Sequence, residues 1–198
     1  MSWMDFSTAE EQQNSFELIP NRTPAKVRLK IRPGGYNDPA KGWTGGYATR
    51  KDASGAVYLD AEFTIIGGKF NKRKVWSLIG LHSPKGPNYE NMGRSFIRAA
   101  LESARGIKAD DMSDAAIKAR QISGFADLDG LEFVAMIEVA PAKDGYDAKN
   151  EIKAALGVSH KDYRSLMDGT APAEASAPAA QKPALAAVGG GAKPAWLD

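Results

Sequence analysis

Residues 25–32, AKVRLKIR, alternate strictly between apolar and cationic side chains. Val27, Leu29 and Ile31 fall on one face of an extended chain, and the opposite face carries four cations: Lys26, Arg28, Lys30 and Arg32. A period of two residues is the property of a β-strand that is buried on one face only. Residues 57–66, VYLDAEFTII, repeat the pattern with acids on the open face. The chain is therefore expected to build an antiparallel sheet with one solvated face.

Further elements follow from the same kind of reading. Gly67-Gly68 interrupts the chain, and residues 74–81, KVWSLIGL, are predicted to return as the second strand of a hairpin. Residues 131–140 alternate again and are predicted to form the last core strand. The apolar spacing in residues 88–106 predicts the main helix, ending at Gly106. A weaker helix is expected over 113–121 and a short one over 148–156.

These elements give a fold class. About five short antiparallel strands, one main helix and a long glycine-rich loop after the first strand predict a mainly β protein with some α. The architecture expected is a five-stranded Greek-key barrel of the oligonucleotide-binding (OB) type. The repeated strand–helix units of a doubly wound nucleotide fold are missing.

The ends of the chain differ in composition from its middle. We predict an acidic N-terminal arm over 1–20, a binding domain over 21–168 and a disordered tail over 169–198, where Ala, Pro and Gly dominate. The tail finishes in Trp196, Leu197 and Asp198, an apolar and acidic tip that is a candidate partner-binding segment. The N-terminus lacks the pattern of a signal peptide, and no run of 18 apolar residues occurs. Zero cysteines favour a reducing cytoplasm.

The charge is unevenly distributed. The whole chain carries only +2, but residues 21–107 hold sixteen Lys and Arg against six Asp and Glu, which makes +10. Residues 1–20 and 108–168 each carry −4. A basic half between acidic flanks predicts an anionic partner that binds locally.

Aromatic residues lie among these cations in two stretches, 32–51 and 67–78. Unstacked bases bind aromatic faces while Lys and Arg meet phosphates, so the combination is typical of a single-strand binding surface with little sequence preference. The candidate contacts are Lys26, Arg28, Lys30, Arg32, Tyr36, Lys41, Trp43, Tyr47, Arg50, Lys69, Phe70, Lys72, Arg73, Lys74 and Trp76. Trp76 could equally belong to the core, since it lies within a strand. We expect three basic elements, the strand at 26–32, the loop at 32–51 and the turn at 69–74, to form one groove for the nucleic acid.

Catalytic signatures are weak. No phosphate-binding G-x-x-x-x-G-K-[ST] motif occurs, and His82 and His160 lack the spacing of metal ligands. Asp60 and Glu62 could bind Mg²⁺ in a nuclease, although balancing neighbouring cations is the simpler role. The residues from Asp127 to Gly130 are better explained as a turn than as a calcium loop. We therefore expect no enzyme activity, cofactor or metal.

The order of motifs is also familiar. A G-x-x-x-x-x-G loop, YLDAEFTIIGGKFNKRKVWSLIGL, GRSFIRAALESARG, LDGLEFVAMIEV and GYDAKNEIKAAL occur in sequence. Over residues 15–165 this arrangement resembles a group of bacteriophage-encoded single-stranded DNA-binding proteins. The resemblance implies a barrel that protects single-stranded DNA in replication or recombination, in a bacterial or phage-infected cell.

Several alternatives remain open from the residues alone. RNA could replace DNA as the ligand, and homo-oligomerisation is open. The tip of the tail is expected to recruit replication or recombination proteins. The other function classes are the Mg²⁺-dependent nuclease and a phage structural or adaptor protein.

Overall fold

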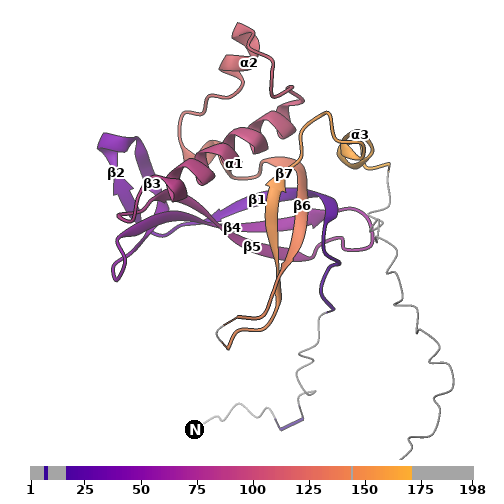
Figure 1. Ribbon diagram of the computed structural model, residues 1–198, viewed down its shortest axis with the longest axis horizontal. Helices are drawn as coiled ribbons and strands as arrows, with labels where there is room; N and C mark the ends of the chain where they lie inside the picture. The colour runs from indigo at the N-terminus through magenta and orange to yellow at the C-terminus, as the bar shows by residue number, and fades with distance from the viewer. Residues whose placement is uncertain (1–6, 9–16, 144, 171–198) are drawn as a thin grey trace, which may run out of the picture.

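A computed structural model describes residues 7, 8, 17–143 and 145–170 (Figure 1). Its strands are β1 (Thr23–Arg32), β2 (Tyr36–Asp38), β3 (Trp43–Lys51), β4 (Ala56–Ile66), β5 (Lys74–His82), β6 (Glu132–Ala140) and β7 (Lys149–Ala155). Its helices are α1 (Asn88–Arg105), α2 (Asp114–Lys118) and α3 (Tyr163–Met167), with 3₁₀ turns η1 (Pro39–Lys41) and η2 (Phe125–Leu128). The mainly β class with a few helices is confirmed. Most of the predicted arm, and the tail with its tip at 196–198, lie outside the described residues.

The strands form one antiparallel, curled sheet. β5 pairs along one edge of β4, while β1 and then β3 pair along the other, so that Asp60 lies opposite both Leu78 and Arg32. β6 pairs with β1, and β7 pairs with β6. The curl brings β7 back to β5, where the Ile152 amide donates to Ser77 Oγ at 2.9 Å. The sheet thereby makes a half-barrel around an apolar interior.

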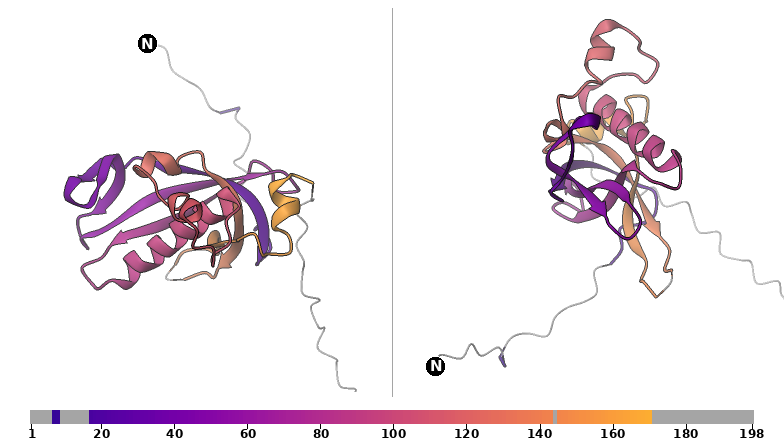
Figure 2. Two further views of the ribbon diagram at one scale, coloured as in Figure 1. Left: turned by 90° about the horizontal axis from the view of Figure 1, so that it is seen from above. Right: turned by 90° about the vertical axis from the view of Figure 1, so that its left-hand side faces the viewer.

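The surroundings of the sheet position the candidate sites. α1 lies along one side of the sheet, the β2–β3 pair projects at one end, and α3 lies at the other (Figure 2). The β6–β7 hairpin extends beyond the sheet (Figure 1). Within the described part of the chain, no helix combines the length and apolar character needed to cross a membrane.

The prediction of about five strands is corrected, because the described residues form a sheet of seven. Residues 36–38 and 43–51, expected as loop, form the strands β2 and β3. β3 pairs with β4 next to β1, along the same edge, and Ala48 lies opposite Leu59. The helix expected over 148–156 is instead β7, so 131–140 is not the last strand. The Lys and Ala residues of β7 favour a helix, but the pairing of β7 with β6 outweighs this local preference. Asn150 also fixes the strand, because its side chain accepts from the N–H of Ile19 and donates to its C=O.

The other predicted elements are confirmed. The apolar faces of β1, β4 and β5 are buried as the alternation requires. α1 ends at Gly106, which adopts the left-handed φ of 66°. Ser113 caps α2, since its Oγ accepts the Ala116 amide at 3.3 Å, and the helix is shorter than the expected 113–121.

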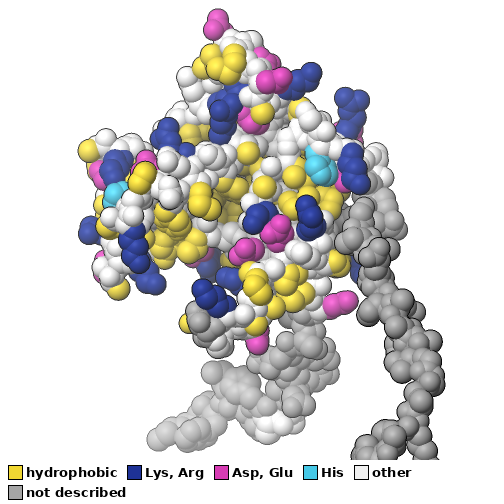
Figure 3. All heavy atoms as spheres, in the orientation of Figure 1, with side chains coloured by type: hydrophobic (Ala, Val, Ile, Leu, Met, Phe, Trp, Pro, Cys, Tyr) yellow, Lys and Arg dark blue, Asp and Glu magenta, His cyan; other side chains and the backbone are white. Residues whose placement is uncertain are grey.

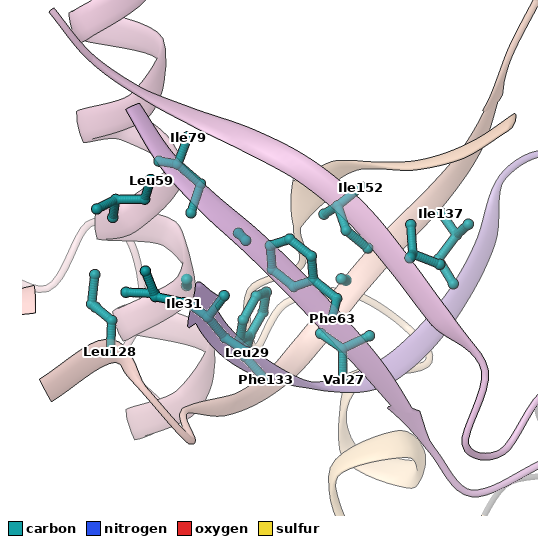
Figure 4. Packing of buried hydrophobic residues seen from close by; sticks show 14 of the residues in the cluster. Val27, Leu29, Ile31, Leu59, Phe63, Ile79, Leu128, Phe133, Ile137 and Ile152 are labelled. Carbon is teal, nitrogen blue, oxygen red and sulfur yellow. The ribbon is translucent and has the colours of Figure 1, made fainter. Parts of the chain in front are cut away.

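The core is centred on three phenylalanine rings. Phe63 from β4, Phe133 from β6 and Phe96 from α1 meet edge to face, with centroids 6.1–6.2 Å apart. Figure 4 shows Phe63 and Phe133 among the aliphatic side chains of β1, β4 and β6. α1 approaches β5 so closely that a Cβ on Gly93 would lie 1.8 Å from the carbonyl oxygen of Gly80. Glycine at position 93 therefore allows α1 to pack directly against the backbone of β5.

Arginine side chains hold the segment between α1 and η2. Arg98 and Arg120 both donate to Glu102 Oε1, at 2.8 and 2.7 Å. Arg120 also donates to the carbonyls of Lys108 and Asp111, and Arg105 to that of Gln121. Burial alone would raise the pKa of Glu102, but hydrogen bonds from the two guanidinium groups outweigh it, and the pKa lies below its ordinary value.

Gly93→Ala should destabilise the protein by more than about 3 kcal/mol, because the added methyl meets backbone that no rotamer change can move. Chemical denaturation measures the effect. Ser95→Ala, at an exposed position of α1, is the matched control and should leave stability within about 0.5 kcal/mol. A Gly93→Ala protein of unchanged stability would contradict the close approach of α1 to β5.

Glu102→Gln should lower the free energy of unfolding by about 1–3 kcal/mol at pH 7, because two guanidinium groups lose their anionic partner. The folded pKa of Glu102 lies below the ordinary 4.5. Its contribution is therefore complete above that value and is lost as the pH falls through the folded pKa. Denaturation curves from pH 7 to pH 3 should show the two proteins converging in acid. A constant difference would contradict this assignment.

Candidate nucleic-acid interface

Three of the four cations on the outer face of β1 form ion pairs with acids on its neighbours. Arg32 pairs with Asp60 of β4 at 2.7 Å, while Lys26 and Arg28 both pair with Glu132 of β6. Lys30 lies opposite Glu62 in the register. A phosphate on this face would have to compete with carboxylates.

The ionisation of these groups follows from the pairing. Hydrogen bonds from Arg28 and Lys26 lower the pKa of Glu132, and the hydrogen bond to Asp60 raises the pKa of Arg32. This face therefore carries alternating cations and acids rather than the uninterrupted positive row expected from the sequence.

A groove of about 550 Å³ lies where the β4–β5 turn meets the start of β7. We call it the Trp76 groove; it is lined by Leu18, Asn71, Lys72, Arg73, Lys74, Trp76, Ala148, Lys149 and Asn150. The Trp76 side chain is 46% exposed, so it does not belong to the core. The groove therefore offers an indole among four cations, of which Lys74 also pairs with Glu62 at 2.9 Å.

The β4–β5 turn is built to present its cations. Gly67 and Gly68 take left-handed φ values, and Asn71 Oδ1 accepts the Gly67 amide at 2.9 Å. Lys72 also has a φ of 67°, a conformation that a lysine adopts at a cost. Arg22, outside the groove, has a similar φ of 62°, so the backbone cost at Lys72 gains its interest from the place of this lysine in the groove lining.

The prediction that Phe70 stacks on bases is corrected. Phe70 is 7% exposed and belongs to the core cluster. The ring folds back under the turn, with Lys69 Nζ 5.5 Å and the Arg73 guanidinium 5.7 Å from its centroid. Arg73 Nη1 also donates to the Glu17 carbonyl at 2.7 Å. Phe70 thus packs the turn against the core, and Trp76 is the exposed aromatic ring next to the turn.

The aromatic residues of the β2–β3 pair lie elsewhere. Tyr36, Trp43 and Tyr47 are half-buried and pack against the core. Lys41 lies over the Trp43 ring at 4.8 Å, and Arg50 lies over Tyr36 at 5.7 Å.

Trp43 also lines a second groove, of about 450 Å³, beside α1 and α2. We call it the Trp43 groove. It shares no lining residue with the Trp76 groove. The expected single groove is thus divided into two separate grooves.

The sequence reasoning missed the contribution of the β6–β7 hairpin. Lys149 lines the Trp76 groove, and Tyr146 is 80% exposed in the same hairpin. Lys149 lies in the segment expected as a helix over 148–156, and that interpretation hid its relation to Trp76. The exposed Leu78, two residues after Trp76 on the same face of β5, could have been found from the alternation.

The two acids considered as Mg²⁺ ligands pair with cations instead. Asp60 and Glu62 are engaged in ion pairs, and the described residues contain no group of three His, Asp or Glu suited to a metal ion. Asp129 Oδ1 accepts the Ile31 amide at 2.8 Å, and Gly130 has a φ of 84°. The segment before β6 is therefore a turn, as predicted.

Comparison with known proteins adds no assignment. A scan against protein-family models finds no match, and a search of curated proteins finds no similar sequence.

Proposed function

We propose that the protein binds single-stranded nucleic acid, without sequence preference and without catalysing a reaction. The observation that carries the proposal is the exposed Trp76, placed in a groove among Lys72, Arg73, Lys74 and Lys149. An accessible indole can stack on an unpaired base while the ammonium groups meet its phosphates. A duplex keeps its bases stacked inside and cannot use the ring in this way.

The strand connections support a more specific fold assignment. β1 pairs with both β4 and β6, β4 pairs with β5, β6 pairs with β7, and α1 lies between β5 and β6. This is the connectivity proposed for an OB barrel, with β2 and β3 as an extension of its first loop. In such barrels the second and third strands and the first and last loops bind oligonucleotides. The Trp76 groove lies between the third strand, β5, and the last loop.

The resemblance to phage single-stranded DNA-binding proteins makes DNA the proposed ligand, with protection of the strand in replication or recombination as the role. Nothing observed favours the nuclease alternative, since Asp60 and Glu62 balance Arg32 and Lys74. Recruitment of partners by residues 196–198 stays a prediction.

Oligo(dT) should quench the intrinsic tryptophan fluorescence and shift in a gel at low salt, with affinity falling steeply as salt rises. Trp76→Ala should weaken binding about 5- to 150-fold, equivalent to about 1–3 kcal/mol for one stacked base. Trp76→Phe is the matched control, because it keeps a flat ring and should retain most of the affinity. A protein that neither changes fluorescence nor shifts oligo(dT) would refute the proposed function.

Lys72→Gly should weaken oligo(dT) binding and yet stabilise the fold by about 0.5–1 kcal/mol, because glycine adopts the left-handed φ without cost. The salt dependence of binding should decrease by about one phosphate contact. Lys69→Gly is the matched control, since it removes one cation from the same turn but relieves no backbone strain. If Lys72→Gly bound oligo(dT) as tightly as the parent, Lys72 would not be a phosphate contact.

A further inference from the structure

The Trp43 groove has an apolar floor that the proposed function does not use. Leu81, Ile97, Leu101, Ile122 and Phe125 line it from β5, α1 and the segment before β6. At its edge, Met112 is 68% exposed and Ile117 is 41% exposed. In Figure 3 the lobe around α2, at the top, presents exposed apolar side chains among both basic and acidic ones. A set of apolar residues spread over floor and edge is typical of a docking surface.

The wall of this groove is fixed in place. Residues 107–122 contain only the short α2, but guanidinium groups bond their backbone. Arg98 donates to the Ala109 carbonyl at 2.9 Å, and Arg120 donates to the Asp111 carbonyl at 2.7 Å. A groove that is held open before a ligand arrives loses less entropy on binding.

The rim of the groove is positive. Arg94, Arg98 and Arg120 line it, against Glu90 as the one acid of the lining. Arg98 and Arg120 already share Glu102, whereas Arg94 lies one helical turn before Arg98 on exposed α1 surface. With Glu90 and Glu102 counted, the rim keeps a small excess of guanidinium charge, and an incoming carboxylate meets it at Arg94, at the edge of the apolar floor.

We propose that the Trp43 groove docks an acidic peptide segment of a partner protein. Aliphatic or aromatic side chains of the peptide fill the floor, and a carboxylate pairs with Arg94, the arginine of the rim that does not share Glu102. Grooves that bind amphipathic segments take up the apolar face of the segment in this way and leave its charged side chains at the edge.

Two other occupants fit less well. A nucleobase would need a free aromatic face, but Lys41 covers the Trp43 ring at 4.8 Å and the ring packs against the core. A second copy joined by two-fold symmetry would place the arginine-rich rims against each other, and like charges repel.

Because the two grooves share no lining residue, a peptide and a nucleic acid can be bound together. The docking proposal does not rest on the proposed function.

The test uses a fluorescein-labelled nine-residue peptide with two Asp-Leu pairs on each side of a central Phe. Fluorescence anisotropy should show saturable binding to the full chain. The same peptide with Lys for every Asp should not bind, and one with Ser for Leu and Phe should bind at least tenfold more weakly. Equal binding of all three peptides would overturn the proposal.

Arg94→Glu and Ile117→Asp should each weaken binding of the acidic peptide at least tenfold. Both positions are exposed, and circular dichroism checks that the variants fold. Lys161→Glu, an exposed charge reversal outside the groove, is the matched control and should bind as the parent does. Arg94→Glu binding the peptide with the affinity of the parent would overturn the proposal.

Two further measurements separate the alternatives. Saturating oligo(dT) should leave peptide affinity unchanged, and Trp76→Ala should also bind the peptide normally. Displacement of the peptide by oligo(dT) would mean that the groove belongs to the nucleic-acid surface. A dimer in sedimentation that Ile117→Asp dissociates would mean that a second copy covers it. Either result overturns the proposal, whereas a failure to bind oligo(dT) at all leaves it standing and refutes only the proposed function.

Discussion

The contact between α1 and β5 is the constraint on which the rest of the structure depends. At Gly93 and Gly80 the helix and the strand meet backbone to backbone, and this approach lets Phe96 complete the cluster with Phe63 and Phe133. The helix covers one face of the curled sheet, so the other face of β4 and β5 is left to solvent. Both grooves follow from this arrangement, because one lies beside the helix and the other at the far end of β4 and β5.

Electrostatic balance decides which cations are available. The basic half of the chain contributes its charges to a sheet whose neighbouring strands carry acids at matching positions. Asp60, Glu62 and Glu132 neutralise cations of β1 and β5, so the net charge of a segment overstates its free positive surface. The cations of the β4–β5 turn lie beyond the ladder, and Lys72 is held there at a conformational cost.

The division into two grooves separates two kinds of chemistry. The Trp76 groove combines an exposed indole with several cations, and the Trp43 groove combines an apolar floor with guanidinium groups. The first arrangement favours an unpaired, highly charged strand. The second favours a ligand with its own apolar side chains, since the one indole there is already covered.

The sequence by itself determined the strands β1, β4, β5 and β6 and the helix α1, because their periodicity reports local burial directly. It also identified the basic, aromatic turn before Trp76. Only the tertiary structure decided that Lys149–Ala155 is a strand, since its pairing with β6 overrides local propensity. Three-dimensional packing likewise buried Phe70, paired Arg32 with Asp60 and sent Trp43 to a different groove from Trp76. These outcomes depend on contacts between residues distant in sequence, which no local pattern records.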